Sequence, residues 1–342
     1  MAIAFRRSGD QDMSFGKKAY AMLAMALACA APATACAWSA GGHAYIALHS
    51  ARSAGSASPR ELCLRMYGAN AVDLFNTTFT REGRALAAVL HDRKSARANL
   101  APLSRARTDD ERAFALGFAT HNEAWGTDAT AHVAGVVAGR REGYVIAKAQ
   151  LLAAEIGPAV EPLLAARGIR LEPAQLLEVC HQFVELAVDL LLVEADPEVG
   201  PWMVQSALCP TADVRRLLVE SLGPVLAPVA GDRARAEALV VAAEADFRQS
   251  LFLNGLALMQ PDAAHQLAVA TGRLAEGYLG LPEGAGAALA PLIELGIGKA
   301  RALCEPDALA EVRTTVDVVD ARLAARRLGQ PPNSLLAARA RR

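Results

Sequence analysis

The chain has 342 residues, of which 53% are hydrophobic and 21% are charged, a composition far from the polar, highly charged one of disordered proteins. The formal net charge is -1, and the sequence contains no long run of Lys or Arg. The usual electrostatic reason to expect binding to duplex nucleic acid is therefore missing. The length suits one large folded domain or two ordinary ones.

The amino-terminal segment has the pattern of a secretory signal peptide. Two lysines precede the apolar run 19–30, and the small-residue stretch 33–37 ends in an Ala-x-Ala cleavage pattern. The apolar run is short for a membrane span, and an uncleaved anchor helix is the alternative. Met13 is an alternative start. We expect cleavage to remove residues 1–37, to leave Trp38 first, and to deliver the protein to a secreted or periplasmic location.

The cysteines outside that segment are Cys63, Cys180, Cys209 and Cys304. In an oxidising compartment they permit one or two disulfides, but their spacing does not decide the pairing. No two of them form a Cys-x-x-Cys motif, so a zinc site built from thiolates is not predicted.

The periodicity along the rest of the chain is helical, because apolar residues recur at spacings of three and four with no sustained period of two. Pro and Gly pairs, among them Gly157-Pro158 and Gly223-Pro224, mark breaks that divide helices rather than domains. We predict a single all-α, multi-helix domain over residues 38–330, followed by a disordered basic tail at 331–342. The helical stretches are 109–123, 143–166, 173–195, 212–227, 233–259, 262–279 and 306–328.

One group of candidate metal ligands lies in the stretch 173–195. His181 and Glu185 are four residues apart, and Asp189 continues the same stripe, so that an imidazole and carboxylates project from one helical face. Apolar neighbours indicate that this helix is largely buried, where an unpaired carboxylate is costly. A buried Glu beside His favours a bound cation, although a single such pair is also compatible with a purely structural contact.

A second group lies between Thr120 and His132. Asp128 and His132 are four residues apart, and His121 precedes Asp128 by seven residues, which is nearly two helical turns. Carboxylate oxygens with neutral imidazoles suit zinc. The alternative is a polar helix face with capping residues around Gly126. The presence of two such groups in one exported chain favours metal binding.

A third element, Trp38-Ser-Ala-Gly-Gly-His43, follows the expected cleavage point directly. With these three elements the chain resembles the zinc-dependent phospholipase C and single-strand-specific nuclease superfamily, whose members are all-α secreted enzymes. In that superfamily the free amine and the carbonyl of an amino-terminal Trp bind zinc, together with a His a few residues later. The resemblance covers residues 38–189 and implies a metal cluster in a cleft between helices.

The resemblance implies three zinc ions, each with several ligands at defined positions in this sequence. Trp38 and His43 match the first ion, with Asp128 as a carboxylate shared with the second. His49 and His265 are left without a role. The implied ligands are Trp38, His43 and Asp128 for the first zinc, Asp128, His121, His91 and Asp73 for the second, and His132, His181 and Glu185 for the third.

The chain departs from the superfamily pattern at the shared carboxylate. The family places this Asp four residues after its His, a position that Trp125 occupies here, whereas Asp128 comes three residues later. Seven residues of unbroken helix rise about 10.5 Å, so we expect a bulge or break at 125–127 that brings Asp128 back toward His121. Glu123 is a spare carboxylate whose i+2 position points away from His121. Asp92 is a rival of Asp73.

The implied reaction is hydrolysis of a phosphodiester. Two adjacent zinc ions lower the pKa of a water between them, while the third neutralises phosphate oxygens and the leaving alkoxide. Asp73 would orient or deprotonate the water. A phospholipid substrate, with transient contact to a membrane surface, is our first expectation, because only 5% of residues are aromatic and a nuclease stacks bases on aromatic rings. The alternatives are a single-strand nuclease of the same superfamily and an exported helical protein that binds metal without catalysis.

Overall fold

Helices make up almost all of the regular structure, as the periodicity predicts, and no strand occurs among the described residues. The expected signal peptide and the expected basic tail both lie outside these residues. The computed structural model describes residues 38–53, 57–76, 78, 80–137, 142–165, 172–279, 284, 286–326 and 328.

All seven predicted stretches agree with helices to within three residues at each end, and helices also form in segments that were not singled out. The helices are α2 (Ala40–Ser53), α3 (Pro59–Asn70), η1 (Ala71–Phe75), α4 (Arg81–Leu90), α5 (Arg97–Arg105), α6 (Asp109–Thr120), η2 (Ala129–Val133), α7 (Tyr144–Ala165), α8 (Pro173–Ala195), α9 (Val199–Leu208), α10 (Ala212–Ala230), α11 (Arg233–Leu258), α12 (Ala263–Leu279), η3 (Gly286–Ala288), α13 (Ala290–Cys304) and α14 (Ala308–Ala325).

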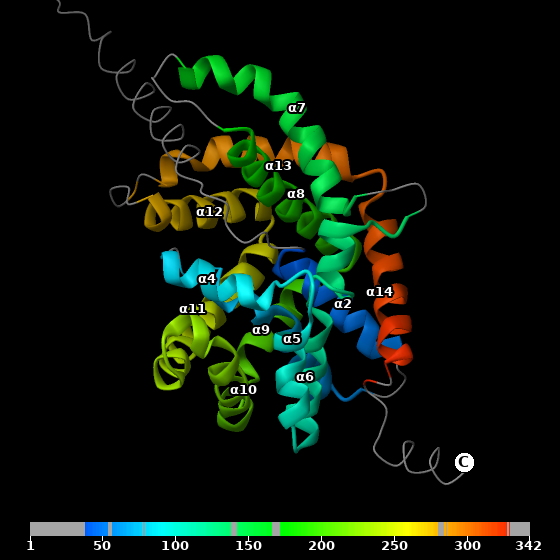
Figure 1. Cartoon of the computed structure of the whole chain (residues 1–342). Coiled ribbons are helices and arrows are strands. Elements are labelled where there is room, and N and C mark those ends of the chain that lie inside the picture. Colours follow the sequence, from blue (N-terminus) through cyan, green and yellow to red (C-terminus); the bar gives the residue numbers. More distant parts are fainter. Residues whose placement is uncertain are drawn as a thin grey trace, which may run out of the picture.

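The helices pack side by side in two groups that share α2. Helices α7, α8, α12 and α13 lie together in the upper part of Figure 1, and α9, α10 and α11 lie below them with α5 and α6. Helix α2 contacts α8 of the first group as well as α3 and α9, and α14 packs along its outer side. Residues at the start of α2 are thereby placed between the two groups.

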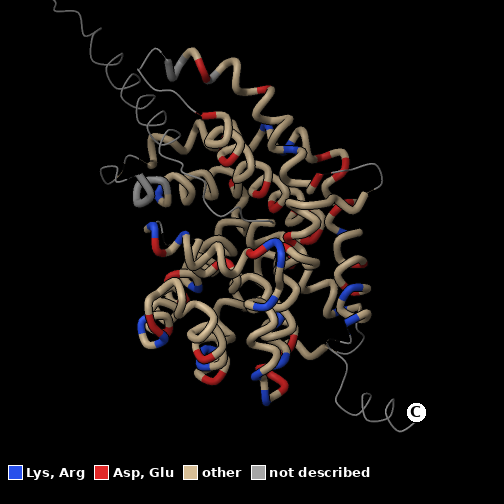
Figure 2. Tube along the Cα trace, viewed as in Figure 1, with Lys and Arg blue, Asp and Glu red and all other residues tan. Residues whose placement is uncertain are grey.

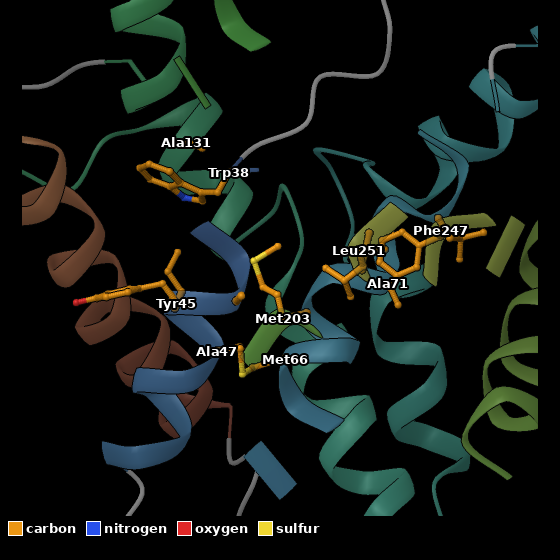
Figure 3. Packing of buried hydrophobic residues seen from close by; sticks show 14 of the residues in the cluster. Trp38, Tyr45, Ala47, Met66, Ala71, Ala131, Met203, Phe247 and Leu251 are labelled. Carbon is orange, nitrogen blue, oxygen red and sulfur yellow. The ribbon is translucent and has the colours of Figure 1, made fainter. Parts of the chain in front are cut away.

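The hydrophobic core is continuous through the molecule. Trp38, Met66 and Met203 are fully buried although they come from three different parts of the chain, and Figure 3 shows Trp38 next to Ala131 at one end of the cluster. Burial of large apolar side chains of this kind is the dominant favourable contribution to folding. The core therefore holds the first residues of the described chain firmly against the segment around Ala131.

Helices α3 and α6 cross at a distance that only glycine allows. A Cβ atom on Gly68 would lie 2.0 Å from the carbonyl oxygen of Phe114, and one on Gly117 would lie 2.0 Å from that of Arg65. The two backbones therefore touch directly. This contact brings the carboxyl ends of α3 and α6 together, and those ends lead into Asp73 and His121.

Two of the predicted helix breaks are wrong. Helix α7 continues through Pro158, and α10 continues through Pro224. Both prolines are exposed, so the carbonyl groups that lose a helical partner can bind water. In α10 the buried stripe that includes Leu222 and Leu226 packs without interruption past the proline.

Among the described residues, no helix combines the length and the apolar composition that are needed to cross a bilayer.

Candidate metal centre

The segment after α6 breaks the helix and folds back on itself. Helix α6 ends at Thr120, three residues before the predicted end, and His121 adopts an extended conformation. The side-chain oxygen of Asn122 then accepts hydrogen bonds from the backbone amides of Ala124, Trp125 and Gly126. Asn and Asp side chains compete with the helix for amide protons in this way, and this turn ends α6.

The break brings Asp128 back to His121, as the departure from the superfamily spacing predicts. The carboxylate Oδ2 of Asp128 lies 3.0 Å from Nε2 of His121. The break begins at His121 and not at Trp125, so its predicted position is late by four residues. Gly126 is essential to the turn, because a Cβ atom there would lie 2.0 Å from the carbonyl oxygen of Thr120.

Two adjoining groups of ligands surround Asp128. His43, His121 and Asp128 form the first, and Asp73, His91 and His121 form the second, with the candidate ligand atoms of each group within 4.8 Å of one another. His121 thus belongs to both groups and Asp128 to the first alone. The resemblance instead gives His121 to the second zinc alone and shares Asp128 between the two. The two carboxylate oxygens of Asp128 face different histidines, since Oδ1 lies 3.8 Å from Nε2 of His43 and Oδ2 lies 3.8 Å from Nε2 of His91.

The third group consists of His132, His181 and Glu185. His132 lies in the π-helix η2, and the other two residues lie one turn apart on the buried face of α8. Nε2 of His181 is 3.2 Å from Nε2 of His132 and 2.7 Å from Oε1 of Glu185. All eight side chains that the sequence proposes as ligands therefore occur in three buried or half-buried groups.

Hydrogen bonds fix the orientation of four of the five imidazoles. His121 donates from Nδ1 to the carbonyl of Ala69 at 2.6 Å, and His91 donates to that of Ala87 at 3.0 Å. Their Nε2 atoms consequently point into the groups, as in metal sites where the second ring nitrogen is held by a protein acceptor. The other two Nδ1 atoms are those of His43, which contacts Oγ1 of Thr127 at 3.3 Å, and His132, which contacts Oε1 of Glu123 at 2.6 Å.

Burial and neighbouring charges shift the pKa values of the ligands around Asp128, downward for some residues and upward for others. Burial, together with the charge of His121, lowers the pKa of His43 to about 3. Burial also opposes the charged form of His121, but the carboxylates of Asp128 and Asp73 outweigh it and raise the pKa of His121 to about 9. For Asp128, burial favours the neutral form, yet the neighbouring histidines hold its pKa far below the usual range.

The first described residues lie against two of the ligand-bearing segments. The indole nitrogen of Trp38 donates to the carbonyl of Thr127 and to Oγ1 of Thr130, both at 3.2 Å, and Oγ of Ser39 donates to the carbonyl of Glu185 at 3.4 Å. Trp38 is therefore next to the segment that carries Asp128. No contact places its backbone nitrogen on a ligand group.

Asp189 has a structural position instead of a place in the third group. Its carboxylate oxygens accept hydrogen bonds from the amides of Gly41 and Gly42 at 3.0 and 2.8 Å. These amides belong to the first turn of α2, where a carboxylate satisfies free N–H groups and interacts favourably with the helix dipole. Asp189, the last residue of the stripe that begins at His181, therefore caps the amino end of α2 and holds it against α8.

The structure separates the rival carboxylates. Asp92 is exposed, and its Oδ1 accepts from the amide of Lys94 in a turn, whereas Asp73 is within 3.1 Å of Nε2 of His91. Glu123 is buried and contacts His132, a role that its i+2 relation to His121 does not indicate.

Two positioning residues were missed by the sequence analysis. The buried side-chain amide of Asn99 donates to the carbonyls of Leu90 and His121, at 3.1 and 2.6 Å, and so joins the ends of α4 and α6 beside two candidate ligands. Glu311 of α14 accepts from the amides of Val136 and Val137. Both residues bind backbone groups of other segments. Such contacts between segments cannot be predicted from a single sequence.

The three groups fit divalent metal ions. Nε2 of His43 is buried without a hydrogen-bond partner, although nearly all buried polar atoms have one. Nε2 of His121 and Oδ2 of Asp128 lie 3.0 Å apart but do not align as a hydrogen bond. The candidate ligand atoms of these three residues lie within 4.8 Å of one another, close enough to surround one cation. Two ligands of a tetrahedral zinc with bonds of 2.0–2.1 Å are about 3.3 Å apart, close to the 3.2 Å between His132 and His181.

Comparisons with protein-family models, with curated proteins and with solved structures gave no match. The three groups of His, Asp and Glu are therefore the features of this chain that point to a function. They establish that this all-α protein has residues placed to hold metal ions.

Proposed function

We propose that the protein is an exported, zinc-dependent phosphodiester hydrolase that acts on phospholipids. The observation that carries the proposal is the position of the Asp128 carboxylate, whose two oxygens face His43 on one side and His121 and His91 on the other. Asp128 belongs to the first group, and its Oδ2 also lies 3.8 Å from Nε2 of His91 in the second, so it would be shared between two ions, as is typical of hydrolytic sites with two metal ions. The donor set of imidazoles and carboxylates without thiolates suits zinc.

Zinc held in these groups would supply positive charge for the phosphodiester oxygens and would acidify water at the site. The chain itself supplies a candidate base in Asp73. Its side chain is 15% exposed, whereas those of Asp128 and Glu185 are 0% and 3% exposed. The nearby histidines keep its pKa low although burial opposes this, so the carboxylate is ionised at neutral pH and can accept a proton from an attacking water.

Neighbouring groups hold Asp73 in position for that role. Nδ2 of Asn76 donates to Oδ1 of Asp73 at 2.7 Å, and Nε2 of His91 lies 3.1 Å from the same oxygen. The second carboxylate oxygen is then directed away from these two contacts. A positioned general base of this kind contributes about 10²–10⁴-fold to a hydrolysis rate.

The surface favours a phospholipid over a polynucleotide. Figure 2 shows Lys and Arg mixed with Asp and Glu at the ends of α6, α10 and α11, and the part of the chain that the structure describes has no basic stripe in this view. Among the described residues, the large hydrophobic side chains that are exposed include no aromatic one, which argues against stacking of bases on an exposed ring. Val133 follows His132 directly and is 46% exposed, which places an apolar side chain at the edge of the third group.

Export with cleavage of the leader would complete the site at the amino end. Removal of residues 1–37 would free the amine of Trp38, whose side chain is bonded to the segment that carries Asp128. Amino-terminal sequencing of protein recovered from the culture medium or periplasm tests this step. A chain that begins at Trp38 is expected, and an intact leader on the active protein would contradict it.

The reaction is tested with zinc-loaded protein on phosphatidylcholine vesicles, on a soluble phosphodiester and on single-stranded DNA. We expect turnover of phosphatidylcholine that falls at least 100-fold in Asp73→Asn. The matched control is Asp92→Asn, which changes the exposed Asp next to His91 and should retain full activity. Preferential cleavage of DNA would identify a nuclease, and the absence of turnover on all three substrates would leave a metal-binding protein without catalysis.

A further inference from the structure

Two cysteines from distant parts of the chain lie side by side. Cys63 is in the first turns of α3, and Cys209 follows the last residue of α9. Cys209 donates from Sγ to the carbonyl of Ser206 at 3.4 Å, and each thiol shifts the pKa of the other. Cys63 also donates from Sγ to the carbonyl of Gln205 at 3.2 Å, and Gln205 precedes Cys209 by one helical turn. Both sulfur atoms are therefore in the same contact between α3 and α9.

An independent contact holds the backbone of Cys209 in this place. Nη1 of Arg60 donates to the carbonyl of Cys209 at 2.9 Å, and Arg60 is itself fixed by an ion pair with Asp110 at 2.9 Å. Because Arg60 and Cys63 are three residues apart on α3, they lie on the same face of that helix. The guanidinium is thus close to both thiols.

The two thiols differ in access and in acidity. Cys63 is 5% exposed and Cys209 is half-buried. The neighbouring Cys209 thiol lowers the pKa of Cys63, with a smaller contribution from Arg60, and these effects outweigh burial. Cys63 and burial raise the pKa of Cys209. The remaining described cysteines, Cys180 and Cys304, are both fully buried. Thiolate character and access decide which cysteines react.

We propose that Cys63 and Cys209 are a dithiol that closes to a structural disulfide by exchange with a disulfide oxidant such as glutathione disulfide. The reaction begins at Cys209 because access favours it, although its pKa is raised. Once it has lost its proton, the Cys209 sulfur attacks the oxidant, breaks its S–S bond and releases one glutathione thiol. The Cys63 thiolate then attacks the Cys209 sulfur of the mixed disulfide and displaces the second glutathione. The two protein thiols are oxidised, the oxidant is reduced to two thiols, and these take up the two protons.

The bond would tie α3 to α9 across a long loop of the chain. A disulfide that closes such a loop removes conformational freedom from the unfolded chain and is expected to stabilise the fold. Helix α3 also carries Ala69, whose carbonyl holds His121. The inference does not depend on the proposed hydrolase activity, because neither cysteine is among the candidate ligands.

The test uses the purified, reduced full chain, equilibrated anaerobically with reduced and oxidised glutathione and then blocked with an alkylating reagent. Peptide mapping without reductant is expected to recover Cys63 linked to Cys209, with Cys180 and Cys304 alkylated only after unfolding. The oxidised protein should melt on the order of 5 °C higher than the reduced protein. Both thiols alkylated after oxidation, or a different pair linked, would overturn the proposal.

Single substitutions test the order of the steps. In Cys63→Ala the mixed disulfide cannot be resolved, so glutathione should remain on Cys209 and appear as one adduct in the intact mass. In Cys209→Ala the buried Cys63 should carry no adduct. Cys180→Ala is the matched control and should still form the linked peptide. Because the mapping of the unaltered chain stands alone, the proposal remains testable if a variant does not fold.

Discussion

The buried carboxylate of Glu123 accepts a hydrogen bond from Nδ1 of His132 across 2.6 Å and determines which ring nitrogen faces the third ligand group. With Nδ1 occupied in this way, Nε2 of His132 is directed to Nε2 of His181 at 3.2 Å. The charge on Glu123 also makes the imidazole a stronger donor to a cation. Glu123 is thus a positioning residue for this group.

Glu123→Gln keeps the size of the side chain and removes its charge. We expect the affinity of the third group for zinc to fall about 10–100-fold, the usual effect of losing a hydrogen-bonded partner of a ligand. Competition with a chromophoric chelator measures this. Glu305→Gln, at an exposed site, is the control. An unchanged affinity in Glu123→Gln would show that the contact has no influence on metal binding.

The number of zinc ions that remain bound tests whether Asp128 is shared between two ions while Glu185 binds only one. Glu185→Gln removes a ligand from the third group alone, so the zinc content should fall from three ions to two. Asp128→Asn removes the charge that faces His43, His91 and His121, and the content should fall to one. Elemental analysis of dialysed protein gives the ratio. Equal losses in both variants would contradict a shared role for Asp128.

Zinc binding should release a proton near neutral pH. The carboxylates of Asp128 and Asp73 overcome the effect of burial and raise the pKa of His121 to about 9, so in the metal-free protein this imidazole is protonated at pH 7. A metal ion binds only the neutral ring. The apparent affinity should therefore rise with pH until about 9 and level off above it.

Calorimetry in buffers of different ionisation enthalpy counts the released protons. Because Asp73 and Asp128 also raise the pKa of His91 against the effect of burial, a value of one or more is expected at pH 7, and it should fall toward zero as the pH rises well above 9. In the metal-free protein, the stability that comes from protonated His121 is fully present below the unfolded pKa of about 6.5. That contribution is lost as the pH rises through about 9. An affinity that does not change between pH 7 and 9 would be inconsistent with this environment of His121.

Gly126→Ala tests the turn that returns Asp128 to His121. The new Cβ would lie 2.0 Å from the carbonyl of Thr120, so the backbone must move, at a cost of about 1–3 kcal/mol. We expect a lower melting temperature together with loss of zinc from the two adjoining groups. Gly298→Ala is the control, because nothing lies within 4 Å of a Cβ at that position and alanine favours a helix by about 1 kcal/mol.

The His, Asp and Glu side chains of the three groups and the all-α fold could be predicted from the sequence, because both depend on local patterns. The spacing of His181 and Glu185 places them on one face wherever a helix forms, and α8 has the predicted bounds. The end of α6 could not be placed, because it depends on the side chain of Asn122 taking three backbone amides that a helix would otherwise use. The roles of Asn99 and Glu123 could not be predicted either, because they depend on contacts with His121 and His132, which only the folded chain brings near.

The breaks expected at Pro158 and Pro224 were wrong because proline was judged without its surroundings. An exposed proline removes a hydrogen bond on the side of the helix that water can reach, and the buried side continues to pack. The propensity of a single residue is therefore a weak guide where a long apolar stripe runs past it.

Helix α14 holds the ligand-bearing segment from the far end of the chain. Glu311 binds the amides of Val136 and Val137, Thr315 contacts Thr130, and Arg322 donates to the carbonyl of Trp125. A polypeptide that is still emerging from a ribosome or a translocation channel lacks this last helix and cannot yet hold the segment in its final shape. The segment that carries Asp128 and His132 is therefore expected to reach its final shape only after α14 has been made.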